Sequence, residues 1–189
     1  ILTAMGEPQR LKGCVVTTNF FQVVGVQPML GRSFPAESET PGSPFTVIIS
    51  HELWQRQLGS DPSLIHKSLT LNGHQVAVIG VMPPAFELQF PTNAHVDMWV
   101  PMIIDAADPG YHDRSNNFLY TLGRLKQGVS QEQAQTEMNL IAGQLQQQYP
   151  ESNAEKGVRV VPLHKQVVGN VESYLYMLFA AVGFLLLIA

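Results

Sequence analysis

The chain has 189 residues, a formal net charge of -4 and only 14% charged residues, together with 15 glycines and 13 prolines. This length suits one domain or two small lobes with a real core, and the many glycines and prolines predict short elements joined by turns. Lysine and arginine form no run, so the composition argues against nucleic acid as a partner, which would require a clustered basic face.

The N-terminus and the cysteine content bear on the compartment. Cys14 is the only cysteine, so an internal disulfide is impossible. Ile1-Leu2-Thr3 lacks the charged start and the apolar stretch of a signal peptide. We therefore expect either a cytosolic protein or an exported one whose export segment lies upstream of Ile1.

The first quarter of the chain predicts strands and short helices. Residues 8–18 form a β-branched strand, and "NFFQVVG" is a short helix capped by Thr18 or Asn19 and ended by Gly25. A turn-rich surface loop follows over 26–44.

A buried strand and a capped helix come next. "FTVIIS" reads as the strand, and Ser50 caps "HELWQRQLG", which Gly59 ends. One face of this helix carries Leu53, Trp54 and Leu58.

A hairpin is the strongest local prediction. Asn72-Gly73 is the type I′ turn dipeptide, and it pairs Leu71 with His74 and Leu69 with Val76. One face should then carry Leu69, Leu71, Val76 and Val78. Gly80 is a candidate bulge. "VDMWVPM" predicts another short strand, and 103–117 a loop.

The final third predicts strand, helix and strand. Residues 117–126 form the first strand, and Ser130 and Gln133 form a capping box for a helix that ends near Tyr149. Residues 157–163 form the second strand, which completes a βαβ-type unit if the strands are parallel neighbours. The helix has an apolar stripe that we expect to pack on the sheet of this unit rather than on a partner helix; it consists of Ala134, Met138, Ile141 and Leu145.

The chain ends in an uncharged apolar run from Ser173 to Ala189. A membrane-spanning helix needs about 20 such residues, and Tyr174 and Tyr176 stand where an aromatic belt would lie. We interpret 171–189 as a truncated transmembrane helix. A buried C-terminal core helix is the alternative, although such a helix usually keeps a polar stripe.

Histidines invite a metal hypothesis, and the six are His51, His66, His74, His95, His112 and His164. His51-Glu52 begins the helical zinc motif H-E-x-x-H, but Gln55 stands where the second histidine belongs. His95 and Asp97 could point the same way from one strand, and His112 and Asp113 are neighbours. No third ligand has a characteristic spacing, so solvated loop histidines explain the pattern better.

Other reactive groups have ordinary explanations. Cys14 could be a nucleophile, but a small residue packed in a strand is the simpler interpretation. Glu37 and Glu39 fit a solvated loop better than an acid–base pair. A ligand pocket could be lined by aromatic residues that more often build a core, namely Trp54, Trp99, Phe20, Phe21 and Phe86.

Several stretches in this order resemble a known family: "VTTNFFQVVGVQPMLGRSF", "VIISHELWQRQLGSDPSLIHKSLTLNGHQVAVIGVMPPAF", "MWVPM", "GRLKQGVSQEQAQTEMNLIAGQLQQQYP" and "VRVVPLHKQVVGNV". They are similar to the MacB-like periplasmic core domain of ABC transporter permeases, within the FtsX-like permease superfamily, and most of all to large permeases of acidobacterial type. Each motif alone is common, whereas their order and spacing are specific.

The resemblance implies an α+β fold with a βαβ-type α/β lobe and an inserted small β-rich lobe, followed by the start of a transmembrane helix. The α/β lobe would comprise 1–30 and 114–170, with its first strand and helix upstream of Ile1, and the inserted lobe would comprise 31–113. Residues 171–189 would begin the second membrane helix of the permease.

The resemblance also implies a non-catalytic domain on the periplasmic side of the bacterial inner membrane. It would couple ATP-driven movement of membrane helices to export or extraction of a substrate. The implied partners are an ABC ATPase subunit, a second permease copy, a periplasmic adaptor protein and the membrane. No functional residue of the family maps onto a named position, so we expect no catalytic, cofactor-binding or metal-binding residue and no cofactor.

Two other classes of function remain open from the sequence. One is a membrane-anchored extracytoplasmic ligand sensor or interaction domain. The other is an anchored hydrolase that uses histidines, with His95 and Asp97 as its metal-binding candidates.

Overall fold

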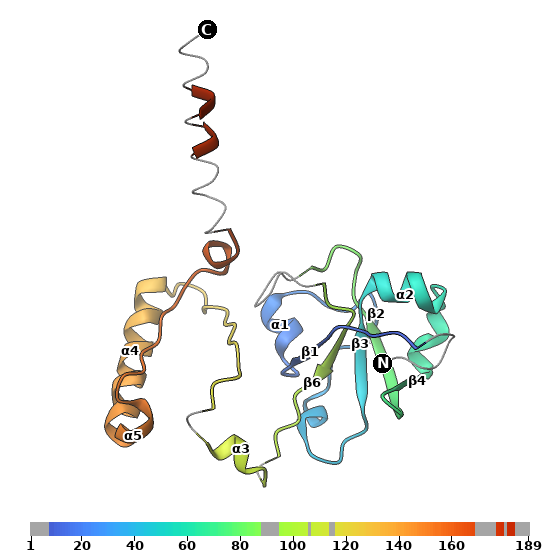
Figure 1. Ribbon diagram of the computed structural model, residues 1–189, viewed down its shortest axis with the longest axis horizontal. Coiled ribbons are helices and arrows are strands. Elements are labelled where there is room, and N and C mark those ends of the chain that lie inside the picture. The colour runs from blue at the N-terminus through green and yellow to red at the C-terminus, as the bar shows by residue number, and fades with distance from the viewer. Residues whose placement is uncertain are drawn as a thin grey trace. The chain divides into compact units, whose positions relative to one another are not determined.

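The computed structural model describes residues 8–87, 95–105, 107–113, 116–168, 177–179 and 181–183. It divides the chain into two compact units, Ile1–Arg124 and Leu125–Ala189, which we call the sheet unit and the helical unit. Figure 1 shows the elements of both. Helices and strands together confirm the predicted α+β class.

The sheet unit contains a six-stranded mixed sheet in its described part, with order β1-β6-β3-β5-β2 and β4 paired to β5. These strands are β1 (Gly13–Val16), β2 (Leu30–Gly31), β3 (Thr46–Ile49), β4 (Ser68–Leu71), β5 (His74–Val81) and β6 (Met98–Pro101). β1 runs parallel to β6, and β3 runs parallel to β5. The connection from β3 to β5 contains α2 (His51–Leu58), so the βαβ-type element of this chain lies here.

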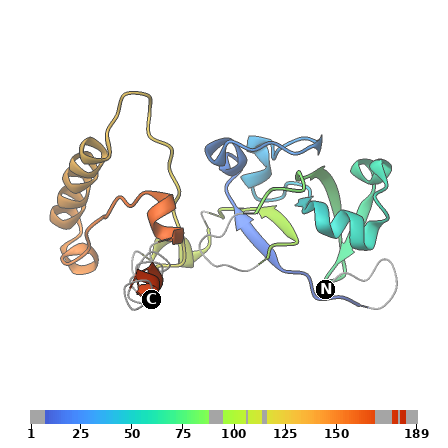
Figure 2. The ribbon, with the colours of Figure 1, turned by 90° about the horizontal axis from the view of Figure 1, so that it is seen from above.

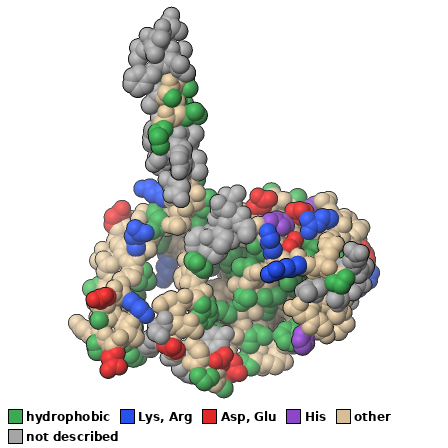
Figure 3. Space-filling view, viewed as in Figure 1, with side chains coloured by type: hydrophobic (Ala, Val, Ile, Leu, Met, Phe, Trp, Pro, Cys, Tyr) green, Lys and Arg blue, Asp and Glu red, His purple; other side chains and the backbone are tan. Residues whose placement is uncertain are grey.

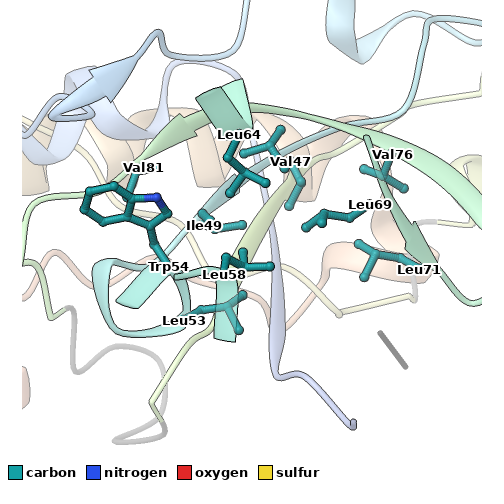
Figure 4. Packing of buried hydrophobic residues seen from close by; sticks show 11 residues of the cluster. Val47, Ile49, Leu53, Trp54, Leu58, Leu64, Leu69, Leu71, Val76 and Val81 are labelled. Carbon is teal, nitrogen blue, oxygen red and sulfur yellow. The ribbon is translucent and has the colours of Figure 1, made fainter. Parts of the chain in front are cut away.

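Both faces of the sheet are buried, and β3 shows why. Its side chains alternate, so Val47 and Ile49 join one cluster while Ile48 joins another. The first cluster includes Leu53, Trp54 and Leu58 of α2 and Leu64 of the 3-10 helix η2 (Pro62–His66), as Figure 4 shows. On the other face, α1 (Phe20–Val24) contributes Phe21, whose side chain is fully buried.

The predicted hairpin is confirmed in register. Leu71 pairs with His74 and Leu69 with Val76, and both turn residues have positive φ, 50° at Asn72 and 83° at Gly73. The four residues predicted to share a face are all in the same core cluster.

A bulge also lies where the glycine predicted one. Val47 pairs with Val78 and Ile48 with Gly80, which leaves Ile79 as the extra residue on β5. A Cβ on Gly80 would lie 2.9 Å from the carbonyl oxygen of Arg32, so glycine permits the close approach of the neighbouring chain.

The predicted helix ends are confirmed at the two longer helices. Ser50 Oγ accepts the Leu53 N–H, and Gly59 ends α2 with a left-handed backbone. The complete capping box of Ser130 and Gln133 starts α4 (Gln131–Gln148). Asn19 occupies the N-cap of α1 without a side-chain hydrogen bond, and Gly25 ends this helix as predicted.

The short remaining elements are η1 (Ala36–Glu39), α3 (Pro109–His112) and α5 (Pro150–Asn153). Figure 2 shows α4, then α5, then an extended segment that returns beside α4. Residues 163–168 are again helical.

The two predicted strands of the final third are wrong, because neither 117–126 nor 157–163 contains strand in the structure. A segment rich in strand-favouring residues forms a strand only where a neighbouring strand pairs with its backbone. The backbone of the second segment instead bonds to side chains of α4. Gln135 Nε2 donates to Val158 O at 2.7 Å, and Val160 N–H donates back to Gln135 Oε1 at 2.7 Å.

The predicted stripe on α4 is therefore only partly covered. Ala134 is buried and Ile141 is 40% exposed, while Leu140 outside the stripe is 66% exposed. The sheet expected beneath it is absent from the described residues of the helical unit. Apolar spacing identified the helix correctly but did not determine what it packs against.

The predicted lobes, 1–30 with 114–170 and 31–113, stay a prediction. The structure joins β1, from the first range, to β6, from the second, in one sheet. The division that it shows falls after Arg124.

The predicted membrane helix at 171–189 lies mostly outside the described residues. Residues 177–179 and 181–183 are helical. Their exposed apolar side chains are Met177, Leu178, Phe179 and Val182. In the part of the chain that the structure describes, no helix combines the length and apolar character needed to cross a membrane.

Candidate functional site

Four charged or titratable side chains meet between α2 and the start of β6. Arg56 Nη1 lies 2.9 Å from Glu52 Oε1, and its Nη2 lies 3.4 Å from Asp97 Oδ1. His95 Nε2 lies 3.3 Å from Glu52 Oε2 and 3.4 Å from Asp97 Oδ1. Each nitrogen-bearing side chain thus bridges both carboxylates, and we call these four residues the ion cluster.

Local sequence explains half of the ion cluster. Ser50 starts α2, which places Glu52 and Arg56 one turn apart on the same face. An exposed pair of this kind contributes little stability, about 0.3–0.5 kcal/mol. About half of each of these two side chains is exposed, so neither provides a water-excluded environment.

Asp97 is the buried member of the ion cluster, with 6% of its side chain exposed. Its Oδ2 accepts the Lys12 N–H at 2.8 Å, and its own N–H donates to Lys12 O at 2.8 Å. Its carbonyl oxygen accepts the Ser50 N–H at 2.8 Å. Asp97 therefore connects the chain before β1, the start of α2 and the start of β6.

This geometry favours a structural role for the ion cluster. Both carboxylate oxygens of Asp97 already have donors from the protein, so its hydrogen bonding holds three chain segments in register. Among the described residues, no group of three or more His, Cys, Asp or Glu is arranged to hold a metal ion.

The structure brings the candidate pair His95 and Asp97 together, and it gives two other histidines aromatic partners. His51 packs against the Trp54 ring at 5.6 Å, and His74 packs against Phe45 at 5.9 Å. The exposed His164 lies in the helical unit. The side chains of His66 and His112 lie outside the described ones.

Cys14 has the properties of a packed thiol. It lies on β1 and is half-buried, and this burial raises the pKa of the Cys14 thiol. Because the thiolate is the nucleophile, a raised pKa lowers reactivity at neutral pH.

The predicted loop acids differ from each other. Glu37 is exposed. Glu39 instead accepts the Thr18 N–H through Oε1 at 2.6 Å. It ties η1 to the start of α1, a role that its sequence neighbourhood of Pro and Ser did not indicate.

The aromatic residues considered as pocket lining are divided between the two faces of the sheet. Phe21 and Trp99 are buried with their ring centroids 5.8 Å apart, and Phe86 lies 5.4 Å from Trp99. Phe20 packs at the edge of this group, whereas Trp54 belongs to the opposite cluster. These residues build the core, which was the simpler of the two interpretations.

Sequence reasoning missed Glu52 and Arg56 as partners of His95 and Asp97. The helical spacing of the first two was visible. The contact of Arg56 with Asp97, 41 positions further along the chain, was not, because it depends on where β6 enters the sheet.

Comparison with known proteins identifies the family. The family model for the MacB-like periplasmic core domain matches residues 3–141, and the chain belongs to this family. Domains of this family are parts of ABC transporter permeases that work with ATPase subunits, and they face the periplasm. The recognition made from ordered sequence motifs is thus confirmed.

Eight chains of solved structures also match this chain. Among them is a domain of a permease protein from Porphyromonas gingivalis, with 18% sequence identity, a TM-score of 0.48 and coverage of 80% of this chain and 68% of that chain. No curated protein matches the chain. The family assignment rests on the family model.

Proposed function

We propose that this chain is the extracytoplasmic domain of an ABC transporter permease. In this role it couples ATP-driven movement of membrane helices to the export or extraction of a substrate. The observation that carries the proposal is the family match over residues 3–141. ATP is hydrolysed by a separate ATPase subunit in this proposal, and the domain itself is not catalytic.

The construction of the sheet unit supports a mechanical role. Both faces of its sheet are packed, and its buried acid, Asp97, holds segments together. A rigid element with two available positions is what coupling over a distance requires. Acidic and basic side chains are interspersed on the face seen in Figure 3.

The proposed setting is the bacterial inner membrane, with the domain on its periplasmic side. The proposed partners are an ABC ATPase subunit, a second permease copy and a periplasmic adaptor. Residues 171–189 would form the start of a membrane helix, which the uncharged sequence from Ser173 onward supports.

Fractionation and co-purification of the protein encoded by the intact gene test the proposal. We expect the protein in the membrane pellet, protease-accessible from the periplasm, and an ABC ATPase retained with it in mild detergent. A protein that stays soluble after membranes are pelleted would contradict the proposal. A membrane protein that retains no ATPase and carries a signalling domain would favour the sensor.

A further inference from the structure

Arg124 makes a contact that spans almost the whole sheet unit in sequence. Its Nε donates to Val23 O at 2.9 Å and its Nη2 donates to Val24 O at 3.0 Å. These are the last two carbonyl groups of α1, which ends at Val24. One planar guanidinium therefore binds two consecutive carbonyls across about a hundred residues of chain.

The chemistry of a helix end makes this contact favourable. The last carbonyls of a helix have no partner within the helix and carry partial negative charge. A guanidinium presents several N–H donors in a fixed planar fork and is always charged. A flexible lysine could reach the same place but would not fill both acceptors with the same geometry.

Gly25 leaves the space that the guanidinium occupies. It ends α1 with a φ of 83°, and a Cβ at this position would lie 2.8 Å from Arg124 Nη2. Gly59 ends α2 with a φ of 64°, and nothing lies within 4 Å of the corresponding Cβ position. The two glycines thus share a backbone role, and only Gly25 has a guanidinium beside it.

Arg124 lies at the boundary between the two units, so its contact with α1 bears on how the units are connected. Arg124 is the last residue of the sheet unit, and Leu125 begins the helical unit. Its target, α1, is fixed to the sheet by the fully buried Phe21, which lies 5.8 Å from the Trp99 ring and 6.1 Å from the Phe34 ring. The contact therefore attaches the exit point of the chain to one of the best-packed parts of the sheet unit.

We propose that Arg124 is a positioning residue that anchors the exit of the sheet unit to the C-terminal end of α1. With the anchor closed, the pivot between the units lies after Arg124. With the anchor open, the mostly exposed residues 116–124 become part of the linker between the two units, and the linker is then longer and more flexible. The role of the anchor in transport rests on the proposed function: in a permease, the anchor would transmit a displacement of the helical unit to α1 and the sheet.

We test the anchor by measuring the distribution of distances between two spin labels on the full chain in detergent. Labels at Ala36→Cys and Glu137→Cys, with Cys14→Ser as background, report the freedom between units. A second pair, Ala36→Cys and Gln55→Cys, reports the integrity of the sheet unit. None of the three label sites, Ala36, Gln55 and Glu137, is adjacent in sequence to Arg124, Val23 or Val24.

We expect Arg124→Ala to broaden the distribution between units and to leave the distribution within the sheet unit unchanged. Arg32→Ala, which removes another exposed arginine of the same unit, should leave both unchanged. Gly25→Ala should broaden the distribution between units because its Cβ displaces the guanidinium. Gly59→Ala imposes similar backbone strain at the end of α2, but we expect it to leave the distribution between units unchanged.

Amide exchange supplies a second readout. The amides of Gly25 and Val26 both donate to Phe21 O, and we expect them to exchange about tenfold faster in Arg124→Ala, since a lost hydrogen bond to a charged group has an effect of this size. If Arg124→Ala also broadens the distance distribution within the sheet unit, the milder variant Arg124→Lys replaces it as the test. We expect Arg124→Lys to broaden the distribution between units and to leave the one within the sheet unit unchanged.

An unchanged distribution between units in Arg124→Ala would overturn the anchor. So would equal broadening by the matched controls Arg32→Ala and Gly59→Ala. These measurements need neither the ATPase nor a substrate. The anchor can therefore be refuted while the permease assignment stands, and the permease assignment can be refuted while the anchor stands.

Discussion

At the scale of single residues, Asp97 is a polar side chain that connects three segments of the sheet unit. It is buried, and its carboxylate receives the Lys12 N–H and the Arg56 guanidinium. We expect Asp97→Ala to lower the free energy of unfolding by about 2 kcal/mol, because it leaves the partly buried Lys12 N–H without the carboxylate that accepts it. Urea unfolding measures this change.

The matched control removes an exposed partner of the same cluster. Glu52→Ala should lower the free energy of unfolding by no more than about 0.5 kcal/mol, since exposed pairs contribute little. Equal losses in the two variants would contradict the assignment of Asp97 as the structural member.

Asp61 gives the residue scale a pH-dependent prediction. The Lys67 ammonium, 2.6 Å away, and the hydroxyl and N–H of Ser63 lower the pKa of Asp61 to about 2. Because the folded pKa lies below the unfolded one, this carboxylate contributes stability above the unfolded pKa. That contribution is lost as the pH falls from about 4 through about 2.

An NMR titration of the Asp61 carboxyl carbon tests this prediction. We expect a midpoint near pH 2, and a midpoint closer to the usual value in Lys67→Ala because the largest cause of the shift is removed. An ordinary midpoint in the unmodified chain would show that the pair with Lys67 does not form in solution.

At the scale of elements, side-chain amides replace a neighbouring strand. Gln131 Nε2 donates to Val160 O at 3.0 Å, Gln135 exchanges two hydrogen bonds with Val158 and Val160, and Gln146 Nε2 donates to Lys156 O at 2.9 Å. The glutamine-rich surface of α4 thus has a partner in the returning chain.

We expect Gln135→Ala to destabilise the helical unit by about 1 kcal/mol, because it removes the donor and the acceptor that hold the backbone at 158–160. Gln147→Ala changes an exposed glutamine of the same helix and serves as the control. Faster amide exchange at Val160 in the first variant alone is the expected result. The same exchange rate in both variants would contradict it.

These elements also show what local sequence could predict. The hairpin at Asn72-Gly73, the cap at Ser50 and the capping box at Ser130 depend on neighbouring residues, and all three were predicted correctly. The segments 117–126 and 157–163 have strand-like composition but depend on distant partners, and strand was wrongly predicted there.

The ion cluster divides in the same way. Period-two spacing made His95 and Asp97 a candidate pair, although solvated loop histidines were the preferred interpretation. Their contacts with Glu52 and Arg56 required the pairing of β3 with β6. Arg124 is the extreme case, because nothing near it in sequence indicates the end of α1 as its target.

At the scale of the whole molecule, the family and the rigid sheet unit support one proposal. In the proposed role, a periplasmic domain of a permease acts by moving, and a sheet packed on both faces would move as one body. The ion cluster and the Arg124 anchor would then matter through stiffness rather than through chemistry.

The most direct test of this central claim is the distance between the two permease copies in the intact complex with its ATPase. A spin label at Glu137→Cys, with Cys14→Ser, reports this distance in detergent with and without ATP. The coupling role predicts a shifted distance distribution when ATP binds, and no shift with an ATPase variant that cannot bind ATP. An identical distribution with and without ATP, in a complex that still hydrolyses it, would contradict the claim that this domain moves with the ATPase cycle.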